Sequence, residues 1–234
     1  MDTLFIVMPA YNEEANIEST VAQWYPILAQ ASSESRLVIA DSGSSDRTHE
    51  ILTDLQASHP QLEILADSDR YHGPKVIALY KYAIAHGADL IFQTDSDGQT
   101  NPAEFADFWA KRNERDATIG YRPVRGDGQD RKFVENVVCM LLNHYFKVQV
   151  PDANAPFRLM RASLVDKYIG RFADDYNLPN IMFTTFFSYY HENIEFLPIS
   201  FKPRGGGKNS VNIPSIVKIG CKALGDFREF KKNM

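Results

Sequence analysis

Three oxygen-bearing side chains alternate in the segment Thr94-Asp95-Ser96-Asp97-Gly98-Gln99. The apolar run Leu90-Ile91-Phe92 precedes the segment and is typical of a buried strand that ends in a loop. Because alternate residues of an extended segment point the same way, Asp95, Asp97 and Gln99 can present their oxygens together. Mg²⁺ and Mn²⁺ prefer oxygen ligands and often bridge to substrate phosphates. The spacing therefore favours a metal–diphosphate site, although Asp-x-Asp is also common in surface turns.

The composition is that of a soluble globular protein. The 234 residues are 44% hydrophobic and 24% charged, and the net charge of −5 argues against a nucleic-acid partner. Cys139 and Cys221 make no disulfide framework, which favours a reduced, cytoplasmic setting. The start of the sequence lacks the features of a signal peptide, and no apolar run approaches the roughly 20 residues of a membrane span. We expect a soluble or peripheral protein.

Strand and helix signals alternate through the first half of the chain. The expected strands cover residues 4–8, 37–40, 62–65 and 90–93. The expected helices cover 13–28 and 75–86, and a further helix runs through Ile51, Leu52 and Leu55 after a turn at 41–46. Strands separated by helices of this length predict βαβ units and a largely parallel sheet. No glycine-rich phosphate loop follows the first strand, which disfavours kinases, Rossmann dehydrogenases and nucleotidyltransferases.

The second half is less regular. Strands are expected at residues 118–121, at 157–160 on a sheet edge, and at 195–201. Helices are expected at 133–146, 181–190 and 213–230, and a loop is expected at 203–208. No repeat, low-complexity tract or linker interrupts the chain, which indicates one domain.

Taken together, these segments resemble the family 2 glycosyltransferases of the GT-A fold, and within them the dolichyl- and polyprenyl-phosphate sugar synthases. The matching segments follow the family's order along nearly the whole chain, and they are Pro9–Ile17, Ile39–Thr48, Thr94–Gln99, Ile119–Arg122, Asp152 with Phe157–Arg158, and Pro198–Ser210. The resemblance implies an α/β GT-A domain over residues 1–234, with a single Rossmann-like, mostly parallel sheet flanked by helices. It places nucleotide-sugar binding in residues 1–100 or so and acceptor binding in the remainder.

The activity that the resemblance implies is an inverting, metal-dependent sugar transfer in cell-surface polysaccharide synthesis. The donor would be a uridine or guanosine diphosphate sugar, and the acceptor polyprenyl phosphate. Two alternatives stay open. One is elongation of a lipid-linked or surface glycan through a sugar hydroxyl, and the other is a non-catalytic protein that binds nucleotide sugars.

The family pattern also assigns the donor pocket. Pro9, Tyr11 and Glu13 after the first strand and Asp41 after the second would line it, with the Tyr11 ring beside the base. The alternative is that Glu13 only suits a helix N-terminus and that Asp41 only forms a turn. The family more often has two acidic residues where Asp41 and Ser42 stand, so one carboxylate is missing here.

The resemblance makes Asp97 the main ligand of Mg²⁺ or Mn²⁺, joined by Asp95 and Gln99. A bound metal would neutralise charge as the nucleotide leaves. Further donor contacts are expected from a glycine–lysine element and from the late loop, at Lys75, Arg204, Lys208 and Ser210. Arg204 is expected to act in catalysis. A solvated lysine at a helix start is the alternative for Lys75.

Arg122 and Arg131 stand where the polyprenyl-phosphate branch carries basic residues that face phosphates. An arginine fork can bind phosphate oxygens bidentately, although an isolated arginine is more often solvated. Arg158 follows Phe157 in an apolar setting and is expected to pair with an acidic residue such as Asp152.

A hydroxyl acceptor would require a general base. Other members of the family place an acidic residue near the start of the late helix, whereas residues 176–185 hold none here. Asp152, Asp174 and Asp175 remain as candidate bases. A phosphate acceptor is already an anionic nucleophile, so the gap favours polyprenyl phosphate.

The last expected helix is amphipathic. Its apolar residues are Ile213, Ile216, Val217, Gly220, Leu224 and Phe227, and its basic residues are Lys218, Lys222, Arg228, Lys231 and Lys232. This pattern indicates either peripheral contact with anionic lipids at the inner face of the membrane, or a helix packed on the domain with a solvated basic face.

Overall fold

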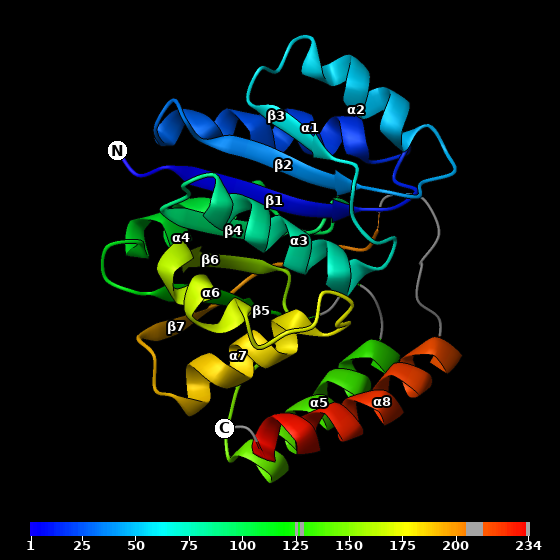
Figure 1. Cartoon of the computed structure of the whole chain (residues 1–234), viewed down its shortest axis with the longest axis vertical. Helices are drawn as coiled ribbons and strands as arrows, with labels where there is room; N and C mark the ends of the chain where they lie inside the picture. Colours follow the sequence, from blue (N-terminus) through cyan, green and yellow to red (C-terminus); the bar gives the residue numbers. More distant parts are fainter. Residues whose placement is uncertain (125, 127–128, 205–212, 233–234) are drawn as a thin grey trace.

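The computed structural model describes residues 1–124, 126, 129–204 and 213–232, and the side chains of these residues apart from 129–130 and 213–222. Seven strands form one sheet in the order β3-β2-β1-β4-β6-β5-β7 (Figure 1). The strands are β1 (Leu4–Ala10), β2 (Arg36–Asp41), β3 (Leu62–Leu65), β4 (Leu90–Thr94), β5 (Ala117–Tyr121), β6 (Phe157–Arg161) and β7 (Ile194–Pro198). The helices are α1 (Ile17–Trp24), α2 (Thr48–Gln56), α3 (His72–Ala85), α4 (Phe105–Lys111), α5 (Gln129–Phe146), α6 (Ala162–Ile169), α7 (Pro179–Tyr189) and α8 (Ile213–Lys232), with 3₁₀ turns at Tyr25–Gln30 and Pro102–Glu104.

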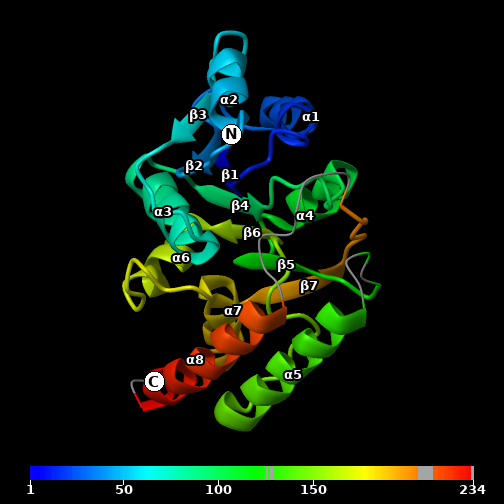
Figure 2. The same ribbon diagram turned by 90° about the vertical axis from the view of Figure 1, so that its right-hand side faces the viewer.

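Helices cover both faces of the sheet (Figure 2). Side chains of β1 alternate between the two sides, with Phe5 and Val7 in one core and Leu4, Ile6 and Met8 in the other. The first core also holds residues of α3, α6 and α7, and the second holds residues of α1 and α4. Helices α5 and α8 lie side by side at one end of the molecule (Figures 1 and 2). The α/β fold with a mostly parallel sheet flanked by helices is therefore confirmed.

The expectation of an edge strand at residues 157–160 was wrong. Strand β6 lies inside the sheet and pairs antiparallel with both β4 and β5. Its residues are buried on both faces, and the Phe157 ring packs at 4.8 Å from the Phe92 and Phe108 rings. Its second residue, Arg158, is fully buried, and a charged residue in the run is why the sequence pointed to an edge strand.

Other boundaries differ where local chemistry interrupts a helix. The helix expected over residues 13–28 begins at Ile17 and gives way to a 3₁₀ turn at Tyr25, where Pro26 lacks the N–H that an α-helix requires. Helices α4 and α6 have no counterpart among the expected elements. Each is only two turns long, so its periodic signal in the sequence is short.

The last ten residues of α8 show how that helix packs. Ala223 and Phe227 are buried, and the Phe227 ring lies 5.8 Å from the Phe146 ring of α5. Lys231 and Lys232 are exposed. The apolar side chains of this part therefore face the protein, as in the second expectation for the helix. The side chains from Ile213 to Lys222 fall outside the described residues, and within the described part no helix could span a membrane.

Candidate active site

The carboxyl ends of β1, β2 and β4 meet at one edge of the sheet. Strand β1 pairs with β2 on one side and with β4 on the other, so the chain order changes direction at β1. Open α/β sheets bind ligands at such a switch point. Here it brings Asp41, the last residue of β2, together with the segments after β1 and β4, which carry Glu13 and Asp97.

A tight turn after β4 holds the two aspartates. The Ser96 hydroxyl donates to the Pro9 carbonyl at 2.8 Å and so ties the turn to β1. The backbone N–H of Gln99 donates to Asp97 Oδ1 at 3.1 Å. Gly98, between them, adopts a positive φ of 73°, which suits glycine. Pro9 therefore contributes through its backbone.

Arg204 joins this turn from the other end of the sequence. Its Nη2 lies 2.6 Å from Glu13 Oε1, and its Nη1 lies 3.8 Å from Asp97 Oδ2. The Gln99 side chain fixes the late segment by donating to the Lys202 carbonyl at 2.7 Å. Glu13, Asp97 and Arg204, which the family pattern singled out, thus lie together. The ligand role of Gln99 stays a prediction.

Burial and neighbouring carboxylates shift two pKa values in the described part of the site. Burial and the neighbouring Asp95 raise the pKa of Asp97 to about 6. Burial also raises the pKa of Glu13, against the opposing effects of Asn16 and Arg204. Side chains whose anionic forms are disfavoured in this way suit a divalent cation.

The two aspartates are the residues that fit such a cation. Oδ2 of Asp95 accepts no hydrogen bond from the described part of the chain. No group of three or more His, Cys, Asp and Glu side chains with metal-binding geometry occurs among the side chains that the structure describes. Proteins usually bind Mg²⁺ through one or two carboxylates, with waters and substrate phosphates as the other ligands.

Asp41 is buried and engaged within its own loop. It accepts hydrogen bonds from the Ser44 hydroxyl at 2.5 Å and faces His49 Nδ1 at 3.2 Å. Ser42, which replaces the second acidic residue, donates to the Asp69 carbonyl at 2.8 Å. Asp41 therefore shapes the loop after β2, and its contact with the nucleotide stays a prediction.

Lys75 is buried and bonded to backbone carbonyls, so it is not the solvated lysine at a helix start that was the alternative. Its ammonium donates to the Ala10 carbonyl and, at 3.0 Å, to the Ser42 carbonyl, so that it joins the ends of β1 and β2. It also lies 5.4 Å from the centre of the Tyr11 ring, which is partly exposed at the mouth of the site. Burial lowers the pKa of Lys75 to about 8.

Replacing Lys75 with Met is expected to remove a rise in stability between about pH 8 and pH 10. The folded chain loses this proton near pH 8 and the unfolded chain near pH 10.4. Because the unfolded state binds the extra proton in that window, wild-type stability should gain on the order of 3 kcal/mol with rising pH. Urea unfolding of both proteins at pH 7.5 and 9.5 measures the difference. Equal pH slopes would contradict the assignment.

Arg122 and Asp152 form a buried bidentate ion pair. The guanidinium Nε and Nη2 lie 2.7 Å and 2.9 Å from the two carboxylate oxygens, and both side chains are at most 5% exposed. Glu135 of α5 lies 3.9 Å from the same guanidinium, and the Phe201 ring lies 4.9 Å below it. The expected partner of Asp152 was wrong: Arg158 donates to the carbonyls of Ala155 and Asn180.

The other predicted site residues lie on other elements or are undescribed. Arg131 lies in the first part of α5. Asp174 pairs with Lys81 at 2.5 Å on the surface, and Asp175 lines a cavity of about 480 Å³ with Tyr176 and Asp226. Lys208 and Ser210, like most of the late glycine-rich loop, lie outside the described residues.

Sequence reasoning missed a set of buried polar residues behind the site. Tyr80, Gln93 and Asn180 are wholly or almost wholly buried, and they connect through hydrogen bonds to Asp95. His72 reaches Asp95 from the solvent side. The signal in the sequence was weak: Gln93 is one polar residue within an apolar strand.

Comparison with known proteins decides the family. A model described as glycosyl transferase family 2 matches residues 5–169. The chain belongs to this family. The chain spans about half the length of the curated relatives it matches. It is 26% identical over 167 residues to an uncharacterized glycosyltransferase of Synechocystis sp., covering 70% of this chain and 51% of that protein. It is also 26% identical over 164 residues to undecaprenyl-phosphate 4-deoxy-4-formamido-L-arabinose transferase of Pectobacterium carotovorum, covering 68% and 49%.

Solved structures agree with this family 2 fold. Glucosyl-3-phosphoglycerate synthase from Mycobacterium tuberculosis, in complex with Mn²⁺, UDP-glucose and glycerol 3-phosphate, superposes with a TM-score of 0.67 at 16% identity. The match covers 95% of this chain and 78% of that one. The complex of the same synthase with Mn²⁺, UDP-glucose and phosphoglyceric acid gives a TM-score of 0.69 at 15% identity. At these identities the likeness concerns the fold, which the GT-A expectation described correctly.

Proposed function

We propose that this family 2 chain is an inverting glycosyltransferase that uses Mg²⁺ or Mn²⁺ and moves a sugar from a nucleotide-diphosphate sugar to polyprenyl phosphate. The observation that carries the proposal is the meeting of Asp97, Glu13 and Arg204 at the switch point of the sheet. The named undecaprenyl-phosphate transferases among the relatives support the acceptor. The Mn²⁺ and UDP-glucose complexes of the fold neighbours support the donor and the cation.

The donor would lie with its diphosphate beside the turn after β4. Asp95 and Asp97, with Gln99 as a third candidate, would hold the cation, which when bound supplies a Lewis acid for the departing diphosphate. Arg204 adds a fixed positive charge next to Asp97, opposite the charge that develops as the bond to the sugar breaks. Lys75 keeps the ends of β1 and β2 at a fixed spacing around the nucleotide.

A phosphate acceptor fits the absence of a free carboxylate near the start of α7. The residue there is Asn180, which is buried and bonded to Gln93. Asp152 holds Arg122 with both oxygens, so its arrangement favours a positioning role and not that of a general base. Arg131, on α5, is then the residue we assign to the acceptor phosphate.

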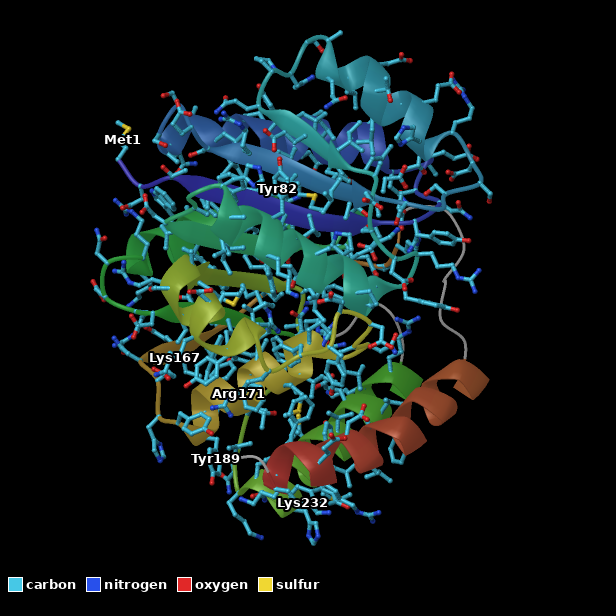
Figure 3. All side chains as sticks on the ribbon, viewed as in Figure 1. Met1, Tyr82, Lys167, Arg171, Tyr189 and Lys232 are labelled. Carbon is cyan, nitrogen blue, oxygen red and sulfur yellow. The ribbon has the colours of Figure 1, made fainter. Side chains whose placement is uncertain are left out.

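Peripheral contact with the membrane forms part of the proposal. Lys231 and Lys232 are exposed at the end of α8, and the Lys231 ammonium lies 4.9 Å from the centre of the Tyr189 ring. Lys232 and Tyr189 lie at the same end of the molecule (Figure 3). Basic and aromatic side chains together suit an anionic lipid surface on the cytoplasmic side.

The test is transfer to a short-chain polyprenyl phosphate, followed by mass spectrometry with a panel of uridine and guanosine diphosphate sugars. We expect product that disappears with a chelator. Arg131→Ala should raise the acceptor KM about ten- to hundred-fold, because a charged hydrogen bond is lost. Lys132→Ala, an exposed neighbour on α5, is the matched control and should leave KM unchanged. Product with simple glycans alone, or equal KM values for the three proteins, would contradict the phosphate acceptor.

A further inference from the structure

A chain of buried side-chain hydrogen bonds ends on one oxygen of Asp95. The Tyr80 hydroxyl of α3 donates to Asn180 Oδ1 at 3.0 Å, and Asn180 Nδ2 of α7 donates to Gln93 Oε1 at 2.9 Å. Gln93 Nε2 of β4 then donates to Asp95 Oδ1 at 3.4 Å. Three separate elements thus meet behind the proposed cation site.

The carboxylate of Asp95, where this series of hydrogen bonds ends, determines which group donates in each bond. An ionised carboxylate only accepts hydrogen bonds, so the atom of Gln93 that faces Asp95 must be its NH₂ group. The Gln93 carbonyl therefore faces Asn180, whose own NH₂ must point to it. The remaining Asn180 carbonyl requires Tyr80 to donate. Each donor polarises the next, and the last contact, at 3.4 Å, is the longest of the three.

His72 supplies a second donor to the same oxygen. Its Nε2 lies 3.2 Å from Asp95 Oδ1, and about half of the ring is exposed. The first turn of α3 that carries it is closely packed, because a Cβ at Gly73 would lie 2.4 Å from the Asn177 carbonyl oxygen. Oδ1 thus has one donor from the interior and one from the surface. Oδ2 has none within the described part of the chain.

We infer that Asn180, Gln93 and His72 are positioning residues for the cation site: they hold Oδ1 of Asp95 so that Oδ2 is presented to the cation. The inference rests on the proposed function, because it needs Asp95 to be a ligand. Partners that orient a metal ligand typically change metal affinity about 10- to 100-fold when they are removed.

The sharpest variant is Asn180→Asp, which keeps the shape of the side chain. A carboxylate at position 180 cannot donate to Gln93, so the Gln93 amide must turn and present its carbonyl to Asp95 Oδ1. We expect Mn²⁺ to bind about 10- to 100-fold more weakly in the presence of UDP, measured by electron paramagnetic resonance of free Mn²⁺. Binding of UDP in the presence of EDTA should be unchanged.

Three further substitutions test the same inference. His72→Ala changes a half-exposed residue and should weaken Mn²⁺ binding in the same direction, whereas His72→Gln, which can still donate, should restore it. Thr185→Val is the matched control: Thr185 is equally buried on α7, and its hydroxyl donates to the Ile181 carbonyl within the same helix. It should lower the melting temperature without changing the affinity for Mn²⁺.

Wild-type affinity for Mn²⁺ in both Asn180→Asp and His72→Ala would overturn the inference, even if melting temperatures fell. The same holds if Thr185→Val weakened Mn²⁺ binding as much as Asn180→Asp. Failure of the proposed function would look different. The wild-type protein itself would then bind no Mn²⁺ with UDP or GDP, and this result would overturn both.

Discussion

Replacing Asp97 with Asn is expected to lower the rate of sugar transfer on the order of 10²- to 10³-fold. The carboxylate lies 3.8 Å from Arg204 and next to Asp95, where it would help to hold the cation on the leaving diphosphate. Loss of one preorganised electrostatic group at a developing charge typically costs that much. The measurement is the turnover of nucleotide sugar with saturating Mn²⁺, for the wild type and the variant.

The same substitution should stabilise the protein without metal. Because burial and Asp95 raise the pKa of Asp97 to about 6, the folded state binds the proton more tightly than the unfolded state. The free energy of unfolding therefore falls as the pH rises from about 4 to 6. Above about pH 6 the ionised Asp97 lowers that free energy by up to about 3 kcal/mol. Asn removes this cost, so thermal unfolding in EDTA at pH 7.5 should shift upward. Asp107→Asn, an exposed change on α4, serves as the control.

Unchanged turnover in Asp97→Asn would refute the proposed site.

Replacing Arg122 with Ala is expected to cost about 3–5 kcal/mol of folding stability. The substitution leaves the Asp152 carboxylate buried without its bidentate partner, and such uncompensated charges are expensive. Removal of both groups in Arg122→Met with Asp152→Leu should recover much of the loss, since paired buried charges are often replaceable by apolar side chains. Urea unfolding of the single and double variants measures both effects.

This expectation changes how the acceptor should be tested. A transfer defect in Arg122→Ala would mix lost phosphate contact with lost structure, whereas Arg131 offers a test that does not break the Arg122–Asp152 pair. If Arg122→Ala proved as stable as wild type, Arg122 would be free to serve the acceptor phosphate directly, as the family pattern suggested.

The edge of the sheet that carries the candidate site could be predicted because strand ends are local features. Asp97 follows an apolar run, and parallel strands bring their carboxyl ends to one edge. Arg204, over a hundred residues later, came from the order of the family's motifs and not from any local pattern. In the structure it lies beside Glu13 and Asp97, and its role in catalysis stays a prediction.

The partners of buried charges could not be predicted. Arg122 and Asp152 are 30 residues apart, and nothing in their neighbours indicates that each is the other's partner. Arg158 was matched to Asp152 by proximity, yet it is satisfied by backbone carbonyls that the fold brings to it. Asn180 and Gln93 belong to elements that meet only in the folded sheet. Hydrogen-bond direction within such networks is a property of the tertiary structure.

The place of β6 in the sheet has a consequence for synthesis on the ribosome. Strand β4 is complete at Thr94, but its free edge is not covered until residues 157–161 emerge and form β6. During this interval the nascent chain exposes the backbone of Leu90, Ile91 and Phe92 as an open, apolar strand edge, which is prone to pair with other chains. Chaperone dependence should therefore be greatest for nascent chains released between about residue 95 and residue 160, and should fall once β6 closes the sheet.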